Sequence, residues 1–120
     1  MSAKQSATPI IRPFGQCESY AQDEPGKATF RWAVKRDEVP GLEIGLVRLE
    51  GPIHKTAAAH TEWEQVYLIC SGSGVVHLGD RSERIEGPTV VTIPKGTRHS
   101  VELAAGETME YAFVNQHHCL

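Results

Sequence analysis

The spacing of apolar residues is the feature that most constrains how this chain can fold. No segment repeats apolar residues at helical spacing over two or more turns, whereas several short stretches alternate with period two between Gly, Pro and Asp residues. Phe30, Trp32 and Val34, for example, share one face of a strand that we expect at about residues 29–36. The pattern predicts an all-β fold.

The remaining strands follow from the same kind of pattern. Residues 65–70 are nearly all apolar, residues 71–74 (Ser-Gly-Ser-Gly) predict a turn, and Gly79-Asp80 predicts a two-residue hairpin loop. About eight to ten short strands at regular spacing are typical of a β-sandwich or a β-barrel. The other expected strands lie at residues 75–78, 89–93, 99–103 and 109–113.

One stretch departs from strict alternation. Leu42, Ile44 and Leu46 share one face of an expected strand, but Val47 and Leu49 are apolar as well. A β-bulge would shift the pattern by one residue, and burial of both faces of the strand would also produce it. The sequence leaves both explanations open.

The length of the chain bounds its organisation. A chain of 120 residues is one domain's worth, and it can bury a core that folds without disulfides or a structural metal. The alternating segments occupy the middle of the chain. We therefore expect an N-terminal arm and loop at residues 1–28, a barrel at 29–114 and a C-terminal tail at 115–120.

Composition argues against several classes of partner and location. Lys and Arg number 12 against 15 Asp and Glu, without long runs of like charge, which disfavours nucleic acid or an anionic membrane as the main partner. The three cysteines are widely separated, so neither a disulfide framework nor a zinc ribbon is implied. No stretch has the length of a signal peptide or a membrane span. We expect a soluble, cytoplasmic protein.

Two stretches combine metal-ligand residue types with turn glycines. Residues 58–74 contain His60, Glu62 and Gln65, and residues 93–99 run Ile-Pro-Lys-Gly-Thr-Arg-His. Over roughly residues 42–114 the sequence resembles the cupin superfamily, whose motifs run Gly-x5-His-x-His-x3/4-Glu-x6-Gly and Gly-x5-Pro-x-Gly-x2-His-x3-Asn. The resemblance implies a cupin-type double-stranded β-helix, or jelly-roll, barrel, in which ligands from both motifs converge on one divalent metal ion.

The second motif matches closely. Pro94, Gly96 and His99 hold their positions, while Pro88 stands where the motif has its first Gly and Leu103 replaces its Asn. The resemblance therefore implies that His99 is a metal ligand.

The first motif can be aligned in two ways. Counting back from Gly72 places Gln65 on the Glu position, His60 on the second His and Ala58 where the first His belongs. A family variant with one Pro deleted instead places His60 on the first His and Glu62 on the second. Both alignments remain open, and they share His60 and Gln65.

The resulting candidate metal ligands are His60, Glu62, Gln65 and His99. Imidazole suits Zn, Fe, Ni or Cu, whereas amide and carboxylate oxygens are harder ligands, so a mixed set favours Zn(II), Ni(II), Mn(II) or Fe(II). Open coordination positions would accept a substrate oxygen or O₂. Gln in place of Glu removes a negative charge, which favours a Lewis-acid or metal-free role over redox chemistry.

Two functions follow from this set. The first is a metal-dependent cupin enzyme that acts on a small organic molecule as an oxygenase, isomerase, lyase or cyclase. The second is a metal-poor cupin that binds a small ligand or serves as a non-catalytic accessory protein. A purely structural or interaction protein is a third possibility, and the fold itself does not decide among the three.

Other histidines and the oligomeric state complete the expectations. We expect His54 and His77 to be structural or exposed, with His54 in reserve as a ligand, and His117-His118 to lie in a frayed tail.

The resemblance also implies a homodimer, because small cupins commonly pair through their N-terminal strands. The apolar surface for pairing would come from Ile10-Ile11 and from the face that carries Phe30, Trp32 and Val34.

Overall fold

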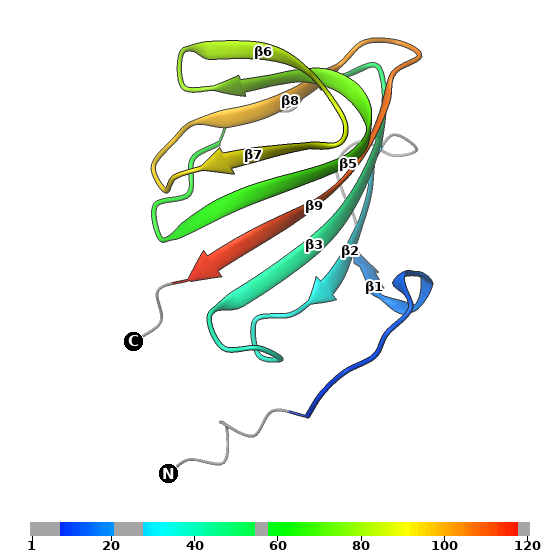
Figure 1. Ribbon diagram of the computed structural model, residues 1–120, viewed down its shortest axis with the longest axis vertical. Coiled ribbons are helices and arrows are strands. Elements are labelled where there is room, and N and C mark those ends of the chain that lie inside the picture. Colours follow the sequence, from blue (N-terminus) through cyan, green and yellow to red (C-terminus); the bar gives the residue numbers. More distant parts are fainter. Residues whose placement is uncertain (1–7, 21–27, 55–57, 118–120) are drawn as a thin grey trace.

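Nine β-strands make up nearly all the regular structure of the residues that the structure describes (Figure 1). The computed structural model describes residues 8–20, 28–54 and 58–117, which also contain one short 3₁₀ turn, Phe14–Gln16. Within these ranges no helix is long and apolar enough to cross a membrane. The strands are β1 (Glu18–Tyr20), β2 (Ala28–Val34), β3 (Leu42–Glu50), β4 (Ile53–His54), β5 (Trp63–Leu78), β6 (Arg81–Glu86), β7 (Thr89–Ile93), β8 (His99–Leu103) and β9 (Thr108–His117). The predicted all-β fold is confirmed.

The strands form two antiparallel sheets that share β5. The first half of β5 pairs with β9 and β7, and beyond β9 follow β3, β2 and β1. The second half of β5 pairs with β6 and β8, and β4 lies at the far edge of β8. Figure 1 shows the sheets curled so that one face of every long strand turns toward a common interior. This is the cupin-type jelly-roll arrangement that the motifs imply.

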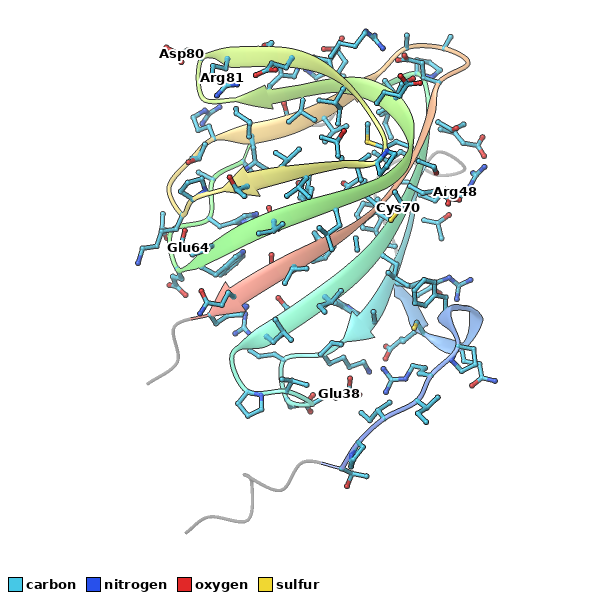
Figure 2. All side chains as sticks on the ribbon, viewed as in Figure 1. Glu38, Arg48, Glu64, Cys70, Asp80 and Arg81 are labelled. Atoms are coloured by element: carbon cyan, nitrogen blue, oxygen red, sulfur yellow. The ribbon has the colours of Figure 1, made fainter. Side chains whose placement is uncertain are left out.

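The long strand β5 corrects one prediction. The turn expected at residues 71–74 is absent, because β5 continues for 16 residues from one sheet into the other. Its pairing with β9 shifts between Ile69 and Ser71, and Gly72 adopts a φ of +92°. A bulge at this position bends the strand instead of reversing it. The hairpin at Gly79-Asp80 is confirmed, since Leu78 pairs directly with Arg81. Asp80 and Arg81 are labelled at this hairpin in Figure 2.

The irregular stretch of β3 is explained by apolar residues on both faces. Val47 and Leu49 are buried on the interior face, whereas Leu46 on the opposite face is partly buried. Pairing between β3 and β9 runs without a break from Leu42 to Glu50, so β3 contains no bulge. Of the two explanations that the sequence left open, the structure supports burial on both faces.

The core lies between the two sheets. Leu49 and Met109 are completely buried, and Ile69 and Leu103 are nearly so. Burying an aliphatic side chain of this size contributes about 1.5–3 kcal/mol to the free energy of unfolding. The alternation predicted for residues 99–103 and 109–113 is confirmed, because the odd-numbered residues of both strands are buried.

Regular structure extends beyond the limits expected from the sequence at both ends. β1 lies within the region expected as an arm and loop, where it pairs with β2. β9 continues to His117, so residues 115–117 form a strand and not a tail, because they pair with β3 and β5. Residues 1–7, 21–27, 55–57 and 118–120, including His118 and Cys119, lie outside the described residues.

Candidate functional site

Two histidines from distant parts of the sequence meet at one end of the interior. His99 begins β8 and is buried, and His60 lies in the segment that leads into β5. The segment is fixed by backbone bonds: Ala58 and His99 exchange N–H···O bonds of 3.0 and 2.8 Å, and the Gly96 N–H donates to the His60 carbonyl at 2.6 Å. The two imidazole centroids are 5.0 Å apart. Backbone hydrogen bonds between the two sequence motifs thus hold the two histidines next to each other.

Both imidazoles can present a nitrogen lone pair. His99 Nδ1 lies 3.0 Å from the Thr97 carbonyl oxygen, which only accepts, so Nδ1 carries a proton, and in the neutral ring Nε2 has the lone pair. Burial lowers the pKa of His60, and the neighbouring His99 lowers it further. His60 is therefore held in the neutral form near pH 7, the form that a metal ion or a hydrogen-bond donor requires.

The inner face of β5 brings a third predicted residue to the pair. Trp63, Gln65 and Tyr67 alternate along this face. The Trp63 ring stacks on His60 with centroids 4.6 Å apart, and Tyr67 presents its ring to His99 at 6.1 Å in a T-shaped contact. Gln65 lies on the same face of the strand, between the residue that contacts His60 and the residue that contacts His99.

The Gln65 side chain has one satisfied and one unsatisfied end. Gln65 is 6% exposed, and its Nε2 donates to Asn115 Oδ1 at 2.7 Å. Its Oε1 is buried and has no hydrogen-bond partner among the described residues, and the same holds for Trp63 Nε1. A buried polar atom without a partner costs roughly 1–3 kcal/mol. The site thus contains one acceptor and one donor that the described residues leave available to a ligand.

Four further polar residues near the site, Arg36, Glu43, Asn115 and His117, were not assigned to it by sequence reasoning. Asn115 Nδ2 donates to Glu43 Oε1 at 2.9 Å, and His117 Nε2 lies 3.3 Å from the same oxygen. The Arg36 guanidinium approaches His117 Nε2 at 3.2 Å. The signal that could have found Asn115 and His117 is the two-residue alternation of β9, which continues unbroken past Phe113.

Other candidates do not join the pair. Glu62 is exposed in the bend before β5. Glu64, at the start of β5 in Figure 2, accepts a bond from the Lys95 N–H at 2.9 Å. His54 and His77 both contact Glu102, at 3.6 and 2.9 Å. They form a separate cluster, because His77 alternates with the inward-facing residues of β5.

The donor types around the pair limit what it can hold. No group of three or more His, Cys, Asp or Glu side chains in the described ranges is arranged to hold a metal ion. A metal at His60 and His99 would therefore need a protein ligand of another type. The unpaired amide oxygen of Gln65 is a donor of such a type.

Solved structures with the same fold include proteins of several kinds. The polyketide cyclase RemF from Streptomyces resistomycificus is 19% identical, with a TM-score of 0.78 over 94% of this chain and 87% of its own. A predicted oxalate decarboxylase from Thermotoga maritima is 15% identical, with a TM-score of 0.80 over 90% and 99%. The cupin domain of Schizosaccharomyces pombe Cnp3 is 16% identical, with a TM-score of 0.74 over 90% and 74%. At these identities the similarity establishes the fold alone.

Family membership comes from the sequence itself. No curated protein matches the chain. The family model of the AraC-like ligand binding domain matches residues 43–118, which include β5, β8, all of β9 and all but the first residue of β3. The matched region contains Glu43, His60, Gln65, His99 and Asn115. The chain therefore belongs to the family of AraC-like ligand-binding domains, and its fold is that of the cupin structures.

Proposed function

We propose that this protein is a small-molecule cupin that holds a divalent metal ion through His60, His99 and Gln65. The observation that carries the proposal is the buried, unpaired Gln65 Oε1 beside two imidazoles that are able to present lone pairs. Imidazole nitrogens bind such ions at about 2.1 Å, which places the centroids of two rings on one ion roughly 5 Å apart. The centroid separation of 5.0 Å agrees with that spacing.

The donor set favours a borderline metal ion and an oxygen-bearing ligand. Two neutral imidazoles and a neutral amide suit Zn(II), Ni(II), Mn(II) or Fe(II), and they leave the charge of the ion uncompensated. An anionic oxygen of a small organic molecule would compensate that charge. When bound, the ion would supply Lewis acidity, which polarises a carbonyl or acidifies a hydroxyl group of the ligand.

The surrounding side chains would orient the organic molecule. Trp63 Nε1 is a buried donor without a partner in the described residues. Burial raises the pKa of Tyr67 to about 12, against an opposing hydrogen bond with Tyr111, so the Tyr67 hydroxyl stays protonated. These donors and the aromatic faces of Trp63 and Tyr67 favour a ligand whose carbon skeleton is apolar and carries oxygen acceptors.

Several proteins of known structure that are similar to this chain support a small organic molecule as the ligand. They include a polyketide cyclase, a predicted oxalate decarboxylase and a DMSP lyase. The reaction types that the sequence leaves open, namely oxygenation, isomerisation, elimination and cyclisation, all fit a Lewis-acid centre with vacant positions. We therefore favour an enzyme among the two functions derived from the sequence.

The test is metal binding by the whole protein. Protein purified without chelators is expected to contain close to one equivalent of metal by elemental analysis. Saturation with the preferred ion at about 100 times its dissociation constant should stabilise the fold by about 2.7 kcal/mol, or raise the melting temperature by roughly 10 °C. Sub-stoichiometric metal in every preparation, together with no stabilisation by Zn(II), Ni(II), Mn(II) or Fe(II), would contradict the proposal.

The second candidate is a metal-free cupin that binds a small ligand or acts as an accessory protein. The observation in its favour is that, among the described residues, no carboxylate joins the interior pair, because Glu62 is exposed and Gln65 is neutral. In that case Gln65 Oε1 and Trp63 Nε1 would bind polar groups of the ligand directly. A stable, metal-free protein whose Trp63 fluorescence responds to small carboxylic or phenolic compounds would favour this function.

Replacing Ala58 with histidine is expected to strengthen metal binding. Ala58 lies directly opposite His99 in an antiparallel bridge, so the two side chains leave the backbone on the same side. A third imidazole there should lower the dissociation constant for Ni(II) or Zn(II) by about tenfold or more, as measured by isothermal titration calorimetry. Glu62→Ala, the matched control, should leave the affinity unchanged. Loss of binding in Glu62→Ala, with no gain in Ala58→His, would instead support the alignment that uses Glu62.

We also propose that the protein forms a homodimer. Ile11 is 99% exposed, and on the outer face of the sheet Leu68 and Val90 are 43% and 63% exposed. Phe30 is buried in the core, so it does not contribute to the pairing surface suggested by the sequence. A second copy would cover these apolar groups. Sedimentation of the parent at micromolar concentration should give about twice the monomer mass of 13.2 kDa. The Leu68→Glu variant should instead sediment at the monomer mass. A parent protein that sediments as a monomer would refute the dimer.

A further inference from the structure

Three polar side chains, one from each of the adjacent strands β3, β9 and β5, form a single row, or rung, across the sheet. Glu43 on β3 is the direct partner of Asn115 on β9, and Asn115 is in turn the direct partner of Gln65 on β5. Asn115 and Gln65 are buried, and Glu43 retains 16% side-chain exposure. Hydrogen bonds of 2.9 and 2.7 Å join the three in sequence.

The chemistry of the first member determines the direction of the whole rung. An ionised carboxylate only accepts hydrogen bonds, so Asn115 must turn its Nδ2 toward Glu43. Asn115 Oδ1 then faces Gln65, and because this oxygen only accepts, Gln65 must donate a hydrogen bond from its Nε2. The only atom that remains at the end of the rung is Gln65 Oε1, which is the buried atom without a partner.

We propose that Glu43 and Asn115 are positioning residues that hold the Gln65 amide with its carbonyl oxygen presented to the metal ion. The role rests on the proposed function as far as the metal is concerned. With the amide rotated by half a turn, Gln65 would present N–H donors, which have no lone pair for a cation, and its Oε1 would face Asn115 Oδ1, acceptor against acceptor. The carboxylate of Glu43 thus selects the only orientation of Gln65 that is able to bind a cation.

Moving the carboxylate from position 43 to position 115 distinguishes this positioning role from a role in packing alone. In Glu43→Gln the first member is able to offer either a donor or an acceptor, so the direction of the rung is no longer imposed. In Glu43→Gln/Asn115→Asp the carboxylate sits in the centre and accepts from both neighbours. Gln65 must then donate its Nε2 once more, and its Oε1 is presented again. A purely structural role for Glu43 predicts no such rescue.

The first measurement is the dissociation constant for Ni(II) or Zn(II) by isothermal titration calorimetry. Glu43→Gln is expected to weaken binding by about tenfold, in the range found for residues that orient metal ligands, and the double variant to restore the parent affinity. Glu50→Gln, on the same strand but half exposed, is the matched control and should bind like the parent. Unchanged affinity in Glu43→Gln, or a double variant weaker than the single one, would overturn the positioning role.

The second measurement needs no metal. In the metal-free parent, the Gln65 side-chain amide protons should exchange slowly with solvent in NMR spectra, because they are buried and hydrogen-bonded. Exchange should be faster in Glu43→Gln and slow again in the double variant. Equal exchange in the three proteins would overturn the inference. Absence of metal binding by the parent would contradict the proposed function, whereas the exchange rates decide the direction of the rung on their own.

Discussion

Replacement of His99 with alanine is expected to abolish the stabilisation that a divalent metal gives to the parent protein. His99 would supply one of only three protein ligands, through the Nε2 lone pair that its contact with the Thr97 carbonyl leaves available. Changes to residues that merely orient ligands already weaken metal sites by about 10–100-fold, so removal of a ligand should cost more than about 100-fold in affinity. The melting temperature of His99→Ala should therefore be the same with and without metal.

The related variants make this series specific. His60→Ala should have the same effect, whereas Gln65→Ala should weaken the metal-dependent shift without removing it, because an amide oxygen is the weakest of the three ligands for these ions. His77→Ala is the matched control, since His77 contacts Ser82 and Glu102 outside the interior pair. The readout is the melting temperature with and without metal, together with elemental analysis. A metal-dependent shift that survives in both His60→Ala and His99→Ala would place any bound ion elsewhere.

Much of the strand pattern could be predicted because a half-buried strand has a simple period. The alternation of His99, Val101 and Leu103 identifies β8 and its buried face, and all three are buried in the structure. The Gly79-Asp80 hairpin could be predicted because its loop length and residue types leave few other conformations. These features depend on residues close to one another in the sequence.

The course of the chain around Gly72 could not be predicted for a complementary reason. Ser-Gly-Ser-Gly provides the backbone freedom for a tight turn and for a β-bulge alike, so local preference does not distinguish them. The choice is made by pairing with β9, where Gly72 lies opposite Met109. Such long-range register is not visible in a short stretch of sequence.

The same distinction applies to the site. His60, Gln65 and His99 could be singled out because each lies in a motif with turn glycines at fixed spacing. Glu43 and Asn115 lie in no motif, and their role arises only because the registers of β3, β9 and β5 place them on one rung. The alternation of β9 could have extended the strand to Asn115, but not its pairing with Glu43.

Substitution of Gly72 with alanine is expected to be the most damaging single change to the stability of the fold. Two effects combine there. Gly72 has a φ of +92°, which L-residues rarely adopt, and an added Cβ would lie 2.0 Å from the Thr108 backbone carbonyl oxygen. The clash is with the backbone of a paired strand, so a side-chain rotation does not relieve it. β5 or β9 would have to shift at the point where β5 passes from one sheet to the other.

Gly106 provides a matched control for the backbone effect alone, because its φ is +86° and an added Cβ would meet nothing within 4 Å. Gly106→Ala should lower the free energy of unfolding by about 1–2 kcal/mol, the cost of the left-handed conformation, whereas Gly72→Ala should lower it by about 4 kcal/mol or more. Urea denaturation followed by circular dichroism measures both. Equal losses would show that the bulge tolerates a side chain. The part of β5 before Gly72 holds Gln65 against β9, and the part after it pairs with His99 on β8. A shift of β5 at Gly72 is therefore expected to weaken metal binding as well.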